Sequence, residues 1–237
     1  MASLTFNQEP EQYLVAVVLR PGNAPAARGA VGILSRLIER LRQTFPNTIL
    51  RVRLDGGFAS PEVLDFLDEQ PDVEYVVNMA SNAVLVRRVR QAMRTARRMS
   101  RKSGETEHVY GELYYQTKKT WKHKRRVIYK AEVVRHPGRL PKDNPRFVVT
   151  NMKQGAKFLY EKVYCQRGDL ENRIKLRPEK LLEMIVWQGG PTKPRIPLRV
   201  AYEVGAARQR TVRSPRTMYP HSQEWRQNRE VTMYLPA

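Results

Sequence analysis

The hydrophobic pattern of the N-terminal third predicts alternating strands and helices. Residues 13–19 and 73–79 are short apolar runs with the length of strands, and the first is apolar enough to be buried on both faces. Residues 49–55 alternate between apolar and polar positions, so one face of that strand is apolar. Helical spacing of apolar residues predicts amphipathic helices at about 30–45 and 60–69. This order of elements predicts an α/β layer with parallel strands.

The middle of the chain changes character. Residues 86–102 have the pattern of a basic helix with a narrow apolar stripe. Residues 110–117, 126–134 and 146–151 are rich in aromatic and β-branched residues and are separated by proline-containing turns, which predicts antiparallel strands. Helical spacing returns over residues 153–164. We therefore expect a β-rich insertion in the α/β layer, followed by a helix.

The last part of the chain loses this regularity. A helix is expected after Pro178 and is ended by Gly189 and Gly190, after which prolines and arginines follow with little periodicity. We expect a poorly structured, basic tail that could bind nucleic acid. The predicted organisation is a first core part over 1–80, a basic helix and β-rich insertion over 81–152, C-terminal core helices over 153–188, and an irregular Pro/Arg-rich tail over 189–237.

The amino-acid composition narrows the range of possible partners and functions. Among 237 residues, 43 are basic and 23 are acidic, which gives a formal net charge of +20 and a pI near 10.4. This imbalance favours a polyanionic partner, most often nucleic acid, over a membrane surface. No apolar run is long enough to span a bilayer, so no membrane association is expected. The single cysteine, Cys165, excludes an internal disulfide and fits a reducing cytoplasm, and four scattered histidines do not form a zinc motif.

Asp55 is a candidate catalytic residue because of its position. It ends the strand at 49–55 and is followed by Gly56 and Gly57, which let a ligand approach the backbone. The carboxyl ends of strands are where α/β sheets place their sites. The alternative is a loop aspartate that caps the next helix, although Ser60 is already placed to do so.

A second candidate lies near residue 171. In a helix, the carboxylate of Glu171 would share one face with the phenol of Tyr164, the guanidinium of Arg167 and the ammonium of Lys175. The carboxylate could hold a divalent metal, and the other three groups could bind phosphate oxygens. The alternative is an exposed helix with a Glu-to-Lys pair at i, i+4, worth a few tenths of a kcal/mol.

The segment 118–126 is densely basic around one tryptophan. Cations with an interleaved aromatic ring suit phosphate contact and base stacking. The candidate DNA-binding residues here are Lys118, Lys119, Trp121, Lys122, Arg125 and Arg126. The alternative is a solvated hairpin tip whose tryptophan covers the sheet.

Four segments together resemble the bacterial insertion-sequence transposases of the DDE class, which have an RNase H-like catalytic core. The segments are Arg53–Ala59, Tyr115–Trp121, Asn144–Asn151 and Tyr164–Arg173. The resemblance covers about residues 3–175. It implies an α/β fold with an RNase H-like mixed sheet and flanking helices, interrupted by a β-rich insertion.

The resemblance also implies roles for individual residues. Asp55 and Glu171 match the second and third catalytic acids, which together with a first aspartate would bind two Mg²⁺ ions about 3.5–4 Å apart. These ions activate water or a 3′-hydroxyl for in-line attack on a phosphodiester. Tyr164 and Arg167 would contact phosphate beside the third acid. Lys175 is nearer to Glu171 than the corresponding lysine of the family usually is.

The partners implied are double-stranded DNA with the terminal inverted repeats of a mobile element, and a second copy of the chain in a homodimer on paired ends. The implied location is the bacterial cytoplasm, in association with the nucleoid. The expected function is DNA transposition, through Mg²⁺-dependent strand cleavage and transfer at element ends.

The sequence departs from the family in two places. The first catalytic aspartate is expected upstream of the strand at 13–19, where Glu9 and Glu11 flank Pro10 and do not fit. The tail is the other departure, and a frameshift near residue 176 would explain it. We therefore expect a truncated and inactive copy that lacks the central strand of the sheet. The alternatives are a non-catalytic basic DNA-binding protein, and an unrelated metal nuclease with a further carboxylate from Glu62, Asp65 or Glu112.

Overall fold

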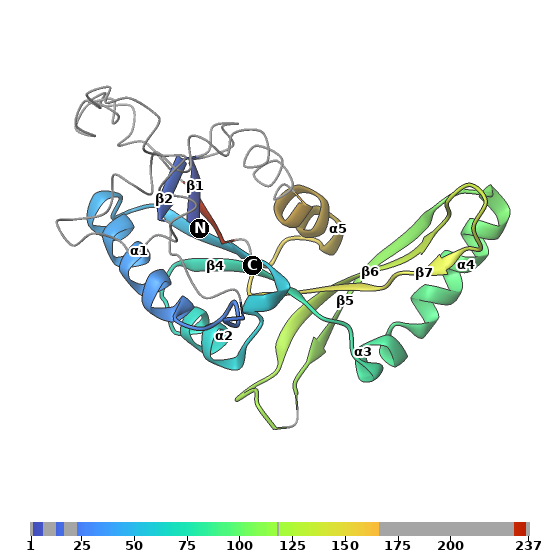
Figure 1. Cartoon of the computed structure of the whole chain (residues 1–237), viewed down its shortest axis with the longest axis horizontal. Helices are drawn as coiled ribbons and strands as arrows, with labels where there is room; N and C mark the ends of the chain where they lie inside the picture. Colours follow the sequence, from blue (N-terminus) through green and yellow to red (C-terminus); the bar gives the residue numbers. More distant parts are fainter. Residues whose placement is uncertain (1, 7–12, 17–22, 118, 166–229, 236–237) are drawn as a thin grey trace, which may run out of the picture. The chain divides into compact units, whose positions relative to one another are not determined.

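The computed structural model describes residues 2–6, 13–16, 23–117, 119–165 and 230–235, and these residues form one mixed sheet with helices packed on it (Figure 1). The sheet has nine strands within the described residues. Eight of them follow the order β2-β1-β9-β3-β4-β8-β6-β5, and β7 pairs with β6. β9, the last strand in the sequence, thus lies between β1 and β3, which come early in the sequence.

The parallel core consists of β3 (Ile49–Leu54) and β4 (Val73–Met79), with α1 (Ala30–Thr44) and α2 (Pro61–Asp68) close by in the sequence. The sequence predicts all four elements, and their parallel pairing is confirmed. The side chains of β4 alternate between two packed faces. Tyr75 faces α2, where its hydroxyl donates to Oδ1 of Asp68 at 2.7 Å.

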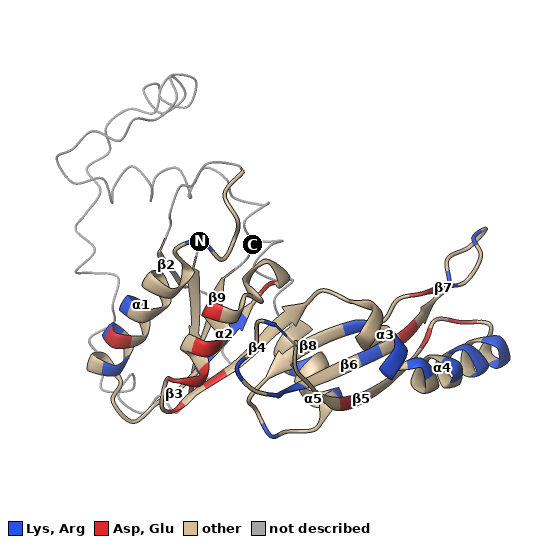
Figure 2. Ribbon diagram, turned by 90° about the horizontal axis from the view of Figure 1, so that it is seen from below, with Lys and Arg blue, Asp and Glu red and all other residues tan. Residues whose placement is uncertain are grey.

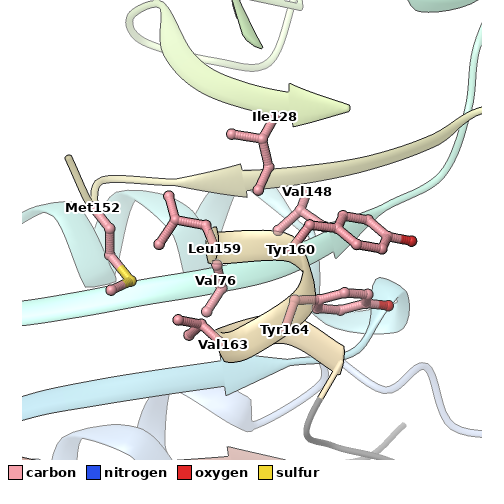
Figure 3. Packing of buried hydrophobic residues seen from close by; sticks show 8 residues of the cluster. All are labelled: Val76, Ile128, Val148, Met152, Leu159, Tyr160, Val163 and Tyr164. Atoms are coloured by element: carbon pink, nitrogen blue, oxygen red, sulfur yellow. The ribbon is translucent and has the colours of Figure 1, made fainter. Parts of the chain in front are cut away.

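The opposite face of β4 is covered by the helix near residue 160. The predicted helix over 153–164 begins at α5 (Ala156–Phe158) and continues as the π-helical turn η2 (Leu159–Tyr164). Figure 3 shows η2 packed on the sheet in a buried cluster. The cluster consists of Val76, Ile128, Val148, Met152, Leu159, Tyr160, Val163 and Tyr164. Helices therefore lie on both faces of the sheet.

The two N-terminal strands form an edge of the sheet. β1 (Ala2–Phe6) and β2 (Tyr13–Ala16) pair in antiparallel orientation, and β2 is the outermost strand. The prediction of a doubly buried strand over 13–19 is wrong for its described part, because Tyr13 is 37% exposed. An apolar run fits either a central strand or a one-sided edge, and the sequence does not distinguish them. Residues 17–19 lie outside the described residues.

The strand next to β3 comes from the C-terminus. β9 (Glu230–Leu235) runs parallel to β3 and antiparallel to β1, where the sequence predicts a missing central strand. Arg51 of β3 forms ion pairs with Glu230 of β9 and with Glu74 of β4, the second at 2.7 Å between Nη2 and Oε2. The prediction of an irregular tail is therefore wrong for residues 230–235. Their apolar and polar alternation is only six residues long and follows an aperiodic stretch.

The insertion extends the same sheet beyond β4. β5 (Glu107–Tyr115), β6 (Arg125–Val134) and β8 (Arg146–Thr150) are antiparallel, as predicted, and β7 (Lys142–Asp143) is a short addition. β8 joins the insertion to β4.

The predicted basic helix is divided into α3 (Ala83–Arg88) and α4 (Arg90–Ser103), which meet at the non-helical backbone of Val89. α4 packs against β5 and β6. None of the helices in the described ranges has the length and hydrophobicity required to cross a membrane.

Candidate functional site

Asp55 lies directly after β3, at its carboxyl end. Its backbone N–H donates to the carbonyl oxygen of Leu235 at 3.4 Å, so β9 holds the position from one side. The side chain makes no helix-capping hydrogen bond, whereas Ser60 Oγ accepts from Val63 N at 3.3 Å and caps α2. Capping therefore does not explain the carboxylate at residue 55, which is only 9% exposed.

Two residues that sequence reasoning missed lie on the same face of the sheet as Asp55. Arg53 precedes Asp55 by two positions, so both side chains point to one face, and Tyr234 pairs with Arg53 across the strands. The Tyr234 hydroxyl donates to Oδ2 of Asp55 at 3.5 Å. The Arg53 guanidinium carbon lies 5.6 Å from the centre of the Tyr234 ring. A phenol and a guanidinium thus accompany the carboxylate, and the three side chains are buried.

Asn78 is a further neighbour of the site. It lies near the end of β4, and a Cβ atom on Gly56 would be 3.2 Å from its Nδ2. Glycine at position 56 therefore allows the amide to lie against the backbone just after Asp55. Carboxylate and amide oxygens are hard ligands that suit Mg²⁺. The sequence signal for Asn78 is weak, although neighbouring parallel strands end at the same edge of a sheet.

Tyr164 lies in the buried cluster of η2. It is 3% exposed, and its ring centre is 5.3 Å from that of Tyr160, as the two adjacent rings in Figure 3 show. Because Arg53 pairs with Val76, a member of this cluster, η2 covers the face of the sheet that carries Asp55. Arg167, Glu171 and Lys175 lie outside the described residues, so the approach of Glu171 to Asp55 stays a prediction.

Tyr160 of η2 and the neighbouring Tyr110 have raised pKa values. Burial raises the pKa of Tyr160 well above its usual range. Burial also raises the pKa of Tyr110, and its hydrogen bond to Oε1 of Glu161, at 3.1 Å, adds to the shift. Both tyrosines therefore stay neutral hydrogen-bond donors at physiological pH.

The tryptophan of the basic segment is a packing residue. Trp121 is 6% exposed, and its ring meets that of Tyr115 edge-on at 5.6 Å between centroids. The Arg125 guanidinium lies 4.9 Å from the centre of the Trp121 ring. This arrangement matches the alternative in which the tryptophan covers the sheet.

The arginines of this segment pair with carboxylates. Arg125 is buried and contacts Asp65 at 2.5 Å and Asp68 at 2.8 Å, both on α2. Burial opposes charge on Arg125, but its hydrogen bonds to these carboxylates raise its pKa overall. Burial would likewise raise the pKa of Asp65, but hydrogen bonds from Arg125 and Lys122 lower it overall. Arg126 pairs with Glu112 on β5 and also donates to the carbonyl oxygen of Met152.

The described lysines of the segment face solvent. Lys119 is exposed, and the Lys122 side chain is 67% exposed although its Nζ lies 3.3 Å from Oδ2 of Asp65. Lys118 lies outside the described residues.

Two of the acids considered for an unrelated metal site, Asp65 and Glu112, form ion pairs with arginines. No group of three or more His, Cys, Asp or Glu residues suited to a metal occurs in the described part of the chain.

A comparison with protein-family models identifies the family to which this chain belongs. The model of the transposase DDE domain, group 1, matches residues 4–182. The chain belongs to this family. Its mixed sheet with flanking helices and a β-rich insertion fits the RNase H-like fold of DDE transposases and confirms the predicted fold class. Neither the curated proteins nor the solved structures gave a match.

Membership of the DDE transposase family implies DNA as the substrate and a divalent metal as the usual cofactor. The transposase domain has a cavity of about 420 Å³ beside its basic segment. Its lining includes Tyr114, Lys124, Arg126, Asn151 and Lys153. The lining also includes Asp68 and Glu112, which pair with Arg125 and Arg126. The exposed Lys124 and Lys153 therefore give the cavity a positive charge.

Proposed function

We propose that this chain binds the double-stranded ends of a mobile element and cleaves and transfers a DNA strand at a site built on Asp55 and Glu171. The family match supports DNA transposition as the reaction. The observation that carries the proposal for this chain is the buried Asp55 carboxylate at the end of β3, on the face that η2 covers and without a capping role.

Asp55, Asn78 and Glu171 offer the hard oxygen ligands that Mg²⁺ requires, and Asp55 and Glu171 are the proposed carboxylate pair. Bound Mg²⁺ would supply Lewis-acid activation of the phosphodiester and of the attacking oxygen. The Tyr234 hydroxyl donates to Oδ2 of Asp55 and restricts rotation of the carboxylate. Cleavage by water breaks the P–O3′ bond and releases a 3′-hydroxyl and a 5′-phosphate. In transfer, that 3′-hydroxyl attacks a phosphodiester of the second DNA, which forms a new P–O3′ bond while the P–O3′ bond of the second strand breaks and its 3′-oxygen leaves as a hydroxyl.

The exposed lysines of the basic segment are the proposed contacts with the DNA backbone there. Lys119 is exposed and can reach a phosphate, and Lys122, whose side chain is 67% exposed, can do so by exchanging its carboxylate partner for a phosphate. Arg125 and Arg126 hold the segment in place through their carboxylate partners. Tyr164, Arg167 and Lys175 are proposed to contact phosphate near Glu171. A homodimer on paired element ends is part of the same proposal.

The test compares Asp55→Asn with Glu39→Gln, a change of the same kind on the exposed face of α1. Cleavage of a duplex carrying an element end is measured with Mg²⁺, and divalent-metal binding is measured by calorimetry. We expect Asp55→Asn to lower the cleavage rate by about 10³-fold and to weaken metal binding, and Glu39→Gln to change neither. Wild-type protein that binds the duplex but never cleaves it would contradict the proposal. That result would favour the truncated, inactive copy expected from the sequence, or the non-catalytic DNA-binding alternative.

A further inference from the structure

The helices α3 and α4 carry a dense and unbalanced charge. Residues 83–104 contain seven arginines and one lysine, at positions 87, 88, 90, 94, 97, 98, 101 and 102, and no acidic residue. Figure 2 shows this basic colouring along α4. The basic segment at 118–126 is different, because its arginines Arg125 and Arg126 pair with carboxylates of the chain itself.

The other face of α4 is fixed to the insertion. Met93, Ala96 and Ser100 are buried against it. The Ser100 hydroxyl accepts from Nε of Arg135 at 2.8 Å, and Arg97 forms an ion pair with Asp143. These contacts on one side of α4 determine which side chains it turns to solvent.

The solvent-facing side of α4 is a row of arginines, which we call the α4 row: Arg90, Arg94 and Arg98, at successive i, i+4 positions. All three are exposed, and none has an ion pair within the described residues. Like charges at i, i+4 destabilise a helix by a few tenths of a kcal/mol per pair, and a helix that is merely solvated usually mixes both signs. Within the described part of the chain, the α4 row therefore has no carboxylate partner, and an external anion would compensate its charge.

The row has the chemistry and spacing of a phosphate-backbone contact. Arginine binds phosphate oxygens through two parallel hydrogen bonds, which a lysine cannot do. Successive members of the row are separated by about 6 Å along the helix axis, and the whole of α4 is about 21 Å long. At 3.4 Å per base step of one strand, that length matches about six nucleotides.

We propose that the α4 row lies along the phosphate backbone of double-stranded DNA and is a principal DNA contact of this chain outside the catalytic residues. The inference rests on the proposed function only in taking DNA as the polyanion. It adds a surface on the insertion, and it assigns the affinity to helix arginines whose charge is not already neutralised.

The test compares two double variants with the same change of charge. Arg94→Gln with Arg98→Gln removes two members of the α4 row, and Arg36→Gln with Arg40→Gln removes an exposed i, i+4 arginine pair from α1. Binding of a fluorescent DNA duplex is measured by anisotropy over a series of salt concentrations. At about 0.1 M salt, the α4 variant should bind roughly tenfold more weakly, with a salt slope smaller by about 2, while the α1 variant stays near wild type.

A third variant separates charge from geometry and guards against misfolding. Arg94→Lys with Arg98→Lys keeps both charges, so it should retain the wild-type salt slope while losing part of the affinity, and circular dichroism should give the wild-type spectrum for all variants. If wild-type protein binds DNA and the α4 and α1 variants bind equally well, the inference is overturned and the proposed function stands. If wild-type protein shows no salt-dependent DNA binding, both fail. Tighter binding to single-stranded RNA than to the duplex would also overturn the inference.

Discussion

At the scale of single residues, Arg125 links three parts of the fold. Its guanidinium contacts Asp65 and Asp68 on α2 and lies over the ring of Trp121. Arg125→Met would leave two neighbouring carboxylates without this partner. We expect the free energy of unfolding to fall by about 2–4 kcal/mol, measured by urea denaturation. Lys119→Met is the control, since Lys119 is exposed and should change stability little.

The same ion pair predicts a dependence of stability on pH. The folded-state pKa of Asp65 is lowered from 3.8, because hydrogen bonds from Arg125 and Lys122 outweigh the effect of burial. The stabilisation is therefore complete above the unfolded pKa and is lost as the pH falls through the lower, folded value. Urea denaturation from neutral pH to about pH 3 should show this loss in wild-type protein and a smaller one in Asp65→Asn. Equal slopes in the two proteins would contradict the assignment.

The position of Asp55 at the end of a strand was predictable from local signals, while its catalytic role stays a prediction. Asp55 follows an alternating strand and precedes a capped helix, and both features are visible within a dozen residues. Tyr234 is 179 residues away from Asp55, and its contact with that carboxylate depends on the pairing of β9. The burial of Trp121 under Arg125 depends on acids of α2. Neither is encoded in the spacing of nearby residues.

At the scale of elements, β9 completes the sheet between β1 and β3. Val231 and Met233 are each 1% exposed, and both edges of the strand are hydrogen-bonded. Proline lacks the backbone N–H and is not tolerated in such a strand. Thr232→Pro should therefore lower the free energy of unfolding by about 3 kcal/mol or more, measured by thermal and urea denaturation.

The matched control at this position is Thr232→Val, which keeps the backbone N–H and the β-branched shape. It should stay within about 1 kcal/mol of wild type. A proline variant as stable as the valine variant would show that β9 contributes nothing to the sheet. The strands β3, β4, β5, β6 and β8 and the helices α1 and α2 were predictable because each has a clear strand or helical period. β9 was not, because six alternating residues carry little signal without knowledge of their partner β3.

At the scale of the whole molecule, which has a net charge of +20, some cations form ion pairs within the fold and others face solvent. Arg51, Arg125 and Arg126 form ion pairs with carboxylates of the fold. Arg90, Arg94 and Arg98 of α4 and Lys119 of the basic segment form no ion pair within the described residues, and these are the groups proposed to attract DNA. The net charge predicted a polyanionic partner, but only the structure distinguishes the cations that hold the fold from those that face outward.

This division predicts that DNA binding and strand cleavage can be separated. Asp55 is a buried carboxylate and is proposed to act on the reacting phosphate, so removing its charge should not weaken the attraction of the outward cations. Asp55→Asn should bind the duplex with the wild-type affinity and salt slope, measured by anisotropy without divalent metal, while cleaving it about 10³-fold more slowly. The double variant of Arg94 and Arg98 should show the reverse order of effects, with weaker binding and cleavage that recovers at high DNA concentration. A loss of affinity in Asp55→Asn as large as in that variant would mean that the two sites are not independent.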